Sequence, residues 1–219
     1  MPDFPFDAAG GPVRATLAEV FAVQAADGAA RAFALSHLDP ARGPVIWVQD
    51  RLTRREAGEP YLPGLGAGFR LIRVDLGKPA DVLWAMEQAL ECRDLGAVLG
   101  EIWGEAPVAG FTATKRLVLR AEAHGVPCWL IRRAAQPDLS AARERWRIAS
   151  APSLPDPDDD IAPGMPVWRA ELFRARGRPP GIWELSWDRA GRRHMVAERR
   201  PAGMPHRATK ATAGTGPAA

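Results

Sequence analysis

The sequence is poor in cysteine and contains no long apolar run. The two cysteines among the 219 residues, Cys92 and Cys128, lie far apart and lack the spacing of metal ligands. This argues against a disulfide-stapled secreted domain, and we expect a free-thiol, cytoplasmic protein.

No stretch approaches the roughly 20 apolar residues of a membrane span. The start at residues 1–5 is acidic and broken by proline, unlike a signal peptide. We therefore expect no membrane association.

Histidine is scarce as well, and no nucleophile motif is present. The four histidines (His37, His124, His194 and His206) are scattered along the chain, and no Gly-x-Ser-x-Gly sequence occurs. These absences argue against a hydrolase triad and against a histidine metal centre. We assign no catalytic residue, no metal ligand and no cofactor, and we expect a protein that is not an enzyme.

Positive charge is concentrated at the C-terminal end of the chain. The formal net charge is +3 and the sequence pI is about 9.3. Residues 190–219 hold six cations against the single acid Glu198, a net of +5, which leaves −2 for residues 1–189. The six are Arg192, Arg193, Arg199, Arg200, Arg207 and Lys210. A duplex-binding face on the body of the protein is therefore not expected.

Short apolar segments alternate with helical patterns over the first two thirds of the chain. Five such segments are typical of buried parallel strands: 15–23, 44–49, 69–75, 97–102 and 128–132. Helices are predicted at 25–38, 79–94 and 112–124, with Pro79 in a first turn, Thr112 as a cap and Gly125 as a stop. The alternation predicts an α/β fold with a mostly parallel sheet flanked by helices.

After residue 140 the pattern changes to an antiparallel one. A further strand is predicted at 145–149, and apolar residues alternate with polar ones at 168–172 and 183–187, on either side of a Gly/Pro-rich turn. This predicts a C-terminal antiparallel extension of the sheet. We accordingly divide the chain into a flexible arm (1–12), a folded domain (13–189) and a disordered basic tail (190–219).

The segment at residues 17–38 has the layout of a strand that enters a phosphate-binding turn. Here the chain resembles the RecA-type ATPase core, in which the turn supplies glycines, a lysine and a hydroxyl. The corresponding residues are Ala22, Asp27, Gly28 and Ala29, and none of them fits its role. A carboxylate at Asp27 about 4 Å from a phosphate would be repelled by several kcal/mol at an effective dielectric constant near 20. We interpret the segment as a strand, turn and helix kept for packing. A nucleotide site built from other groups stays open as the alternative.

Two acids follow predicted strands and stand roughly where RecA-type ATPases place their catalytic acids. Asp50 corresponds to the acid that orients the attacking water, and Glu101 to the acid on the magnesium side. Both lie at C-terminal strand ends, where doubly wound sheets bind ligands. Because no phosphate cradle accompanies them, we expect both to be solvated loop carboxylates.

Several stretches, in order from about residue 17 to 188, resemble the ImuA family of RecA/SulA-like proteins from bacterial mutagenesis operons. The matching stretches are LAEVFA, GPVIWVQD, YLPGLG, ADVLWAMEQALECRDLGAVLGEI, FTATKRLVLRAEAHGVPCWLIRR, ARERWRIASAPS and WRAELFRARGRPPGIWELSWD. The family includes members with and without an intact phosphate loop, so its loss here is compatible with membership.

The resemblance implies a RecA-like fold and a non-catalytic accessory role in SOS-induced translesion DNA synthesis. The partners it implies are an inactive Y-family polymerase-like protein, an error-prone replicative-type polymerase and the RecA recombinase. Any DNA contact is expected to be weak or indirect. An atypical RecA-like ATPase, or a DNA-binding module that uses the basic tail, remains as the alternative.

Candidate contact residues lie mainly at the C-terminal end. Arg174, Arg176 and Arg178 cluster near the predicted hairpin turn, where they suit either phosphate contact or protection of a strand end. The tail arginines Arg192, Arg193, Arg199 and Arg200 suit weak DNA binding, partner docking or solubility. Most tryptophans are predicted to pack in the core or at its edges, with Trp103 as a candidate partner anchor.

Overall fold

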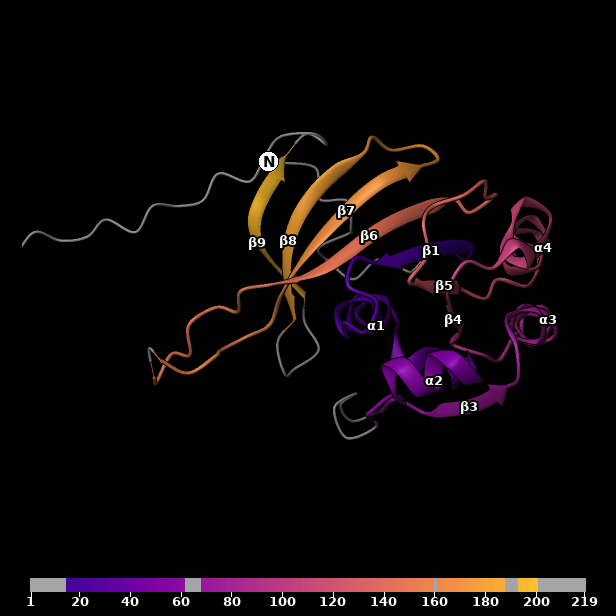
Figure 1. Ribbon diagram of the computed structural model, residues 1–219, viewed down its shortest axis with the longest axis horizontal. Helices are drawn as coiled ribbons and strands as arrows, with labels where there is room; N and C mark the ends of the chain where they lie inside the picture. Colours follow the sequence, from indigo (N-terminus) through magenta and orange to yellow (C-terminus); the bar gives the residue numbers. More distant parts are fainter. Residues whose placement is uncertain (1–14, 62–67, 160, 188–192, 201–219) are drawn as a thin grey trace, which may run out of the picture.

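One nine-stranded sheet organises the protein. The computed structural model describes residues 15–61, 68–159, 161–187 and 193–200. The strands lie in the order β3-β2-β4-β5-β1-β6-β7-β8-β9 (Figure 1). Their bounds are β1 Leu17–Ala22, β2 Val45–Asp50, β3 Leu71–Leu76, β4 Ala97–Trp103, β5 Cys128–Arg133, β6 Glu144–Ala151, β7 Val167–Ala175, β8 Gly181–Trp187 and β9 Arg193–Arg200.

The first six strands are parallel, and the last three are antiparallel. β1 pairs in parallel with both β5 and β6, whereas β6, β7, β8 and β9 follow one another as antiparallel neighbours. Figure 1 shows β7 to β9 extending away from the helices, which gather beside the parallel part. The predicted α/β class, with a mostly parallel sheet and a C-terminal antiparallel extension, is confirmed.

The helices cover the two faces of the parallel part. They are α1 Ala29–Ser36, α2 Arg51–Ala57, α3 Pro79–Ala89 and α4 Phe111–His124, with short 3₁₀ turns at Pro40–Arg42 and Pro107–Ala109. One buried cluster joins α1 to inward side chains of β1, β5 and β6 and continues under β7 and β8. A second cluster on the other face joins α3 and α4 to β1, β2, β4 and β5. Because successive strand residues point to opposite faces, the apolar runs serve both clusters.

Local sequence signals explain most helix ends, although several ends differ from the prediction: α3, for example, ends at Ala89 rather than at residue 94. Pro79 begins α3, and Gly125 ends α4 with a left-handed φ of 73°. Thr112 does not cap α4, because the helix already begins at Phe111 with Gly110 as its cap. α1 begins at Ala29 rather than at residue 25, and α2 was not predicted. α3 packs closely on β4, since a Cβ atom at Gly100 would collide with Sδ of Met86.

The ends of the chain differ in part from the predicted domain boundaries. Residues 193–200, which were predicted to belong to a disordered tail, form β9 against β8. Residues 201–219 and the predicted flexible arm (1–12) lie outside the described residues. None of the described helices is both long enough and apolar enough to cross a membrane.

Candidate functional site

In the turn between β1 and α1, where a phosphate loop would lie, the carboxylate of Asp27 accepts the available hydrogen bonds itself. Oδ1 of Asp27 accepts hydrogen bonds from the backbone N–H of Ala29 (2.9 Å) and from the hydroxyl of Ser150 (2.8 Å). Oδ2 accepts from the backbone N–H of Ser150 at 2.8 Å. A carboxylate is favourable at a helix N-terminus because unsatisfied N–H groups point there. Asp27 thus takes a place that a bound anion would use, and it ties the turn to β6.

Two backbone carbonyls of the same turn accept hydrogen bonds from a buried arginine. Arg133, the last residue of β5, is fully buried. Its Nη1 donates to the backbone carbonyls of Ala25 (2.5 Å) and Asp27 (2.8 Å). A phosphate cradle requires backbone N–H groups that converge on the ligand. In this turn, two carbonyls converge on a guanidinium instead.

The carboxylate of Glu101 in β4 accepts hydrogen bonds from four side chains near this turn, which together form a polar network. Its carboxylate accepts from Nε of Arg133 and, at 2.9–3.1 Å, from Nε and Nη2 of Arg31 in α1. Gln49 and Trp47 of β2 donate to Oε2 of the same carboxylate at 2.8 and 3.3 Å. Glu101 is fully buried, and its bonds with Arg133, Gln49 and Trp47 lie in a region of low dielectric constant.

Arg31 also links this network to α2. Nη1 and Nη2 donate to the backbone carbonyls of Ala57 and Gly58, both at 2.8 Å. The guanidinium lies 5.8 Å from the ring centre of Trp47, within the range of a cation–π contact. All the nitrogens of Arg31 therefore donate to protein groups.

The second acid, Asp50, serves as a helix cap. Oδ1 accepts from the N–H of Thr53 at 2.6 Å, and Oδ2 accepts from the N–H of Trp103 at 3.2 Å. Asp50 and Glu101 do lie at the C-terminal ends of neighbouring strands. The expectation that they are solvated loop carboxylates is wrong, because both are buried and hydrogen-bonded.

The four predicted loop positions are packed or capping residues, and polar residues nearby that were not predicted form the network around Glu101. Ala22 and Ala29 are buried, and Gly28 is the exposed cap of α1. Arg133 and Gln49 were not singled out, although each is a polar residue at the end of an apolar strand. Such a residue at that position indicates an internal polar partner, which here is Glu101.

A second buried ionic cluster lies on the opposite face of the sheet. Glu19 in β1 accepts from Nε of Arg145 at 2.7 Å, and its Oε1 lies 3.7 Å from Nη1 of Arg132. Burial raises the pKa of Glu19 above its ordinary value of 4.5, and the nearby Arg145 partly opposes that shift. Both guanidinium groups also lie within 6 Å of the ring centre of Phe21. This cluster was not predicted from the sequence.

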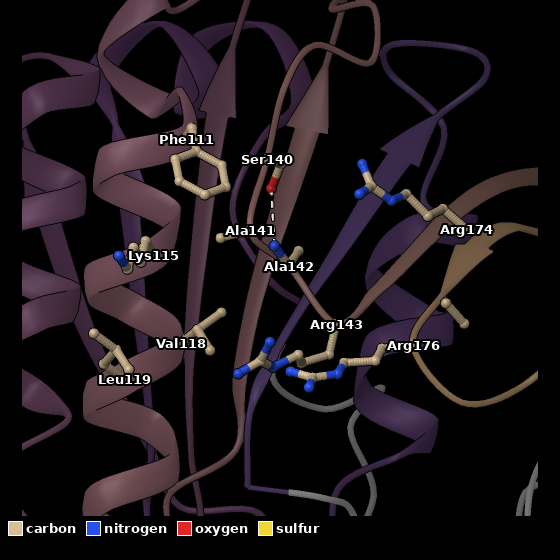
Figure 2. Close-up of a pocket in the computed structure, with 11 residues that line it drawn as sticks. Phe111, Lys115, Val118, Leu119, Ser140, Ala141, Ala142, Arg143, Arg174 and Arg176 are labelled. Atoms are coloured by element: carbon tan, nitrogen blue, oxygen red, sulfur yellow. Dashed lines mark hydrogen bonds between the residues drawn. The ribbon is translucent and has the colours of Figure 1, made fainter.

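The three hairpin arginines do not form one tip. Arg174 and Arg176 are exposed and border a groove of about 420 Å³ between α4 and the end of β7 (Figure 2). Arg178 instead pairs with Glu144 at 2.6 Å and packs 5.2 Å from the ring centre of Trp146. Arg193, Arg199 and Arg200 belong to β9, and Arg192 lies outside the described residues.

Two further sequence predictions concern tryptophan and metal binding. Trp47, Trp129, Trp146, Trp168 and Trp183 are buried, whereas Trp84, expected to pack, is 64% exposed on α3. Trp103, the candidate partner anchor, is partly buried at the end of β4. Within the part of the chain that the structure describes, no group of three or more His, Cys, Asp or Glu side chains could hold a metal ion.

Comparison with known proteins places the chain in a family. No protein-family model matches it. Protein ImuA of Caulobacter vibrioides, from strain NA1000/CB15N and from strain ATCC 19089/CB 15, is 40% identical to it over 163 residues. The matched region is 68% of this chain and 62% of each relative, so the chain spans less than two thirds of their length. On this similarity, the chain belongs to the ImuA family.

Proposed function

We propose that the protein is a non-catalytic accessory factor in damage-induced mutagenesis, and that it acts through protein contacts rather than through ATP hydrolysis. The similarity to protein ImuA supports the pathway. The observation that carries the non-catalytic role is the buried Glu101 carboxylate, which Arg31 and Arg133 neutralise from two sides.

An ATPase of this architecture would need three groups that are committed elsewhere here. The carboxylate near the metal would have to face a hydrated Mg²⁺, but Glu101 is fully buried and ion-paired. The turn would have to present N–H groups, but two of its carbonyls point at Arg133. The water-orienting acid would have to be open, but Asp50 caps α2. These commitments favour a structural use of the former nucleotide region.

The partners we propose are those that the family resemblance implies. They are an inactive Y-family polymerase-like protein, an error-prone replicative-type polymerase and the RecA recombinase. Since none of the described groups is arranged for chemistry on DNA, we propose that the protein positions these factors relative to one another.

Affinity purification of the tagged full chain from DNA-damaged cells tests this function. We expect the polymerase-like proteins to co-purify, and to remain bound after apyrase has removed ATP. A parallel complementation of cells that lack their own copy should restore damage-induced mutation. Loss of the partners on ATP removal would contradict the proposal, and so would normal mutation frequency without the protein.

A further inference from the structure

The groove between α4 and the end of β7 has one helical wall with exposed apolar groups. Phe111, Lys115, Val118 and Leu119 line it, and their spacing of four, seven and eight residues puts them on one face of α4 (Figure 2). Phe111 is 45% exposed and Leu119 is 53% exposed, whereas Val118 is buried at the base of this wall. Large apolar groups grouped on one face indicate a binding surface more often than singly scattered ones do.

The facing wall is cationic. Arg143, Arg174 and Arg176 line it opposite Lys115, and no acid is among the lining residues (Figure 2). Arg143 is paired with Glu122, which lies beside the groove, through bonds of 2.7 and 3.0 Å. Over the described ranges of the chain, no ion pair involves Lys115, Arg174 or Arg176. Glu122 also acts electrostatically on Arg176 without forming an ion pair with it. This acid therefore partly offsets two of the four cations that line the groove, and the lining keeps a net positive charge.

Two hydrogen bonds of ordinary length hold the floor of the groove in place. The N–H of Ala141 donates to the hydroxyl of Thr114 in α4 at 3.0 Å, and the N–H of Ala142 donates to the hydroxyl of Ser140 at 3.1 Å. The small side chains of Ala141 and Ala142 leave the space open. A groove of about 420 Å³ falls in the size range of preformed ligand sites and accommodates a few side chains.

We propose that this groove binds an acidic amphipathic segment of a partner protein. The apolar side of the segment packs on Phe111 and Leu119, and its carboxylates face Arg174 and Arg176, as helices dock in grooves elsewhere. This inference rests on the proposed accessory function and names the surface and the partner chemistry that the function would use. Residues 190–219 of the chain itself have a net charge of +5, which does not complement the charge of the groove.

The same groove is less suited to single-stranded nucleic acid. Such sites combine a positive track with several aromatic rings on which successive bases stack. Phe111 is the one aromatic side chain among the lining residues, and the remaining apolar ones are aliphatic. Charge complementarity to carboxylates, together with an aliphatic wall, favours a protein segment.

Fluorescence anisotropy with the full chain tests the proposal. The probe is a labelled amphipathic peptide of about 15 residues, four helical turns, with leucines on one face and glutamates flanking them. A sister peptide carries lysine in place of glutamate, and a labelled oligothymidylate serves as the nucleic-acid probe. The key variant is Arg174→Glu/Arg176→Glu, and its charge-matched control is Arg51→Glu/Arg93→Glu, two exposed sites outside the groove.

We expect the groove variant to weaken binding of the acidic peptide at least about tenfold, and the control to stay within about twofold of wild type. Leu119→Gln should weaken it several-fold, whereas Ile161→Gln, at a 94% exposed site elsewhere, should not. Equal loss in both charge variants would overturn the proposal. So would tighter binding of the oligothymidylate, or of the lysine peptide, at the groove.

Failure here is distinguishable from failure of the proposed function. If the acidic peptide does not bind but the polymerase-like proteins co-purify without ATP, the groove assignment is wrong and the accessory role stands. If the peptide binds but mutation does not depend on the protein, the accessory role is wrong and the groove assignment stands.

Discussion

Arg31, in the first turn of α1, donates from two nitrogens to the carboxylate of Glu101 in β4, at 2.9–3.1 Å. The acid and its cation thereby join a helix to the centre of the sheet. A buried pair of this kind does not by itself add much stability, but removal of one partner is costly because the other charge stays buried.

Glu101→Gln should therefore lower the free energy of unfolding by about 3–5 kcal/mol, because Arg31 and Arg133 would then lack a counter-charge. Urea unfolding followed by circular dichroism measures this change. The matched control is Glu56→Gln in α2, whose ion pair with Arg55 is exposed and should cost less than about 1 kcal/mol. Equal stability of the two variants would show that Glu101 is not a structural centre.

Restoring the residues of a phosphate loop should not restore ATP binding. The quadruple variant Ala22→Gly, Asp27→Gly, Gly28→Lys and Ala29→Thr supplies the glycines, the lysine and the hydroxyl. The carbonyls of the turn would still face Arg133, and Glu101 would still be ion-paired. We expect no saturable ATP binding in a variant whose circular dichroism shows it to be folded. Micromolar ATP binding by this variant would contradict the prediction, because it would show that the residues at these four positions alone prevent binding in the wild-type protein.

The stability of the protein should depend on pH through Glu19. Its folded-state pKa is raised above 4.5 because of burial, so between 4.5 and the raised value the folded state holds a proton that the unfolded state has released. Stability from this group is therefore present below pH 4.5 and is lost as the pH rises through the folded-state pKa. Glu19→Gln removes that loss.

Urea titrations of wild type and Glu19→Gln across this range measure the effect. We expect the free energy of unfolding of the variant to lie further below that of wild type at a pH under 4.5 than at neutral pH. Glu56→Gln, in which the acid is exposed, should show no such trend. The opposite slope would show that pairing with Arg145 outweighs the desolvation of Glu19.

The two thiols should differ in reactivity. Cys92 is exposed after α3, whereas Cys128 is fully buried in β5, where burial raises the pKa of its thiol well above the ordinary value. Because the thiolate is the reactive form, a disulfide reagent should modify one thiol in the native protein and both in denaturant. Cys92→Ser should abolish the native reaction. Rapid modification of two thiols under native conditions would contradict the burial of β5.

The periodicity of the sequence predicted most of the fold because buried strands and amphipathic helices leave local signatures. The strand at 44–49 and the helix at 79–94 are typical cases, and the observed β2 and α3 differ mainly at their ends. α2 was missed because Arg51–Ala57 is short, has one fully buried side chain and so shows little periodicity. β9 was missed because its composition suggests a tail, and its pairing with β8 is a tertiary effect.

The site was less predictable than the fold. The sequence shows that Ala22, Asp27, Gly28 and Ala29 do not match a phosphate loop. It does not show that the nearby acids are buried and hydrogen-bonded. Whether Glu101 faces solvent or a cation depends on Arg133, which is 32 residues away and reaches it only through the sheet order. The α4–β7 groove likewise joins residues from three separate segments, and only Arg174 and Arg176 were singled out beforehand.

Isothermal titration of the wild-type chain with ATP and Mg²⁺ tests the central claim most directly. We predict no saturable heat of binding up to millimolar ATP, because Asp27, Arg133 and the Arg31–Glu101 pair occupy the region that a triphosphate would need. Micromolar, magnesium-dependent binding that Arg31→Ala weakens would contradict it.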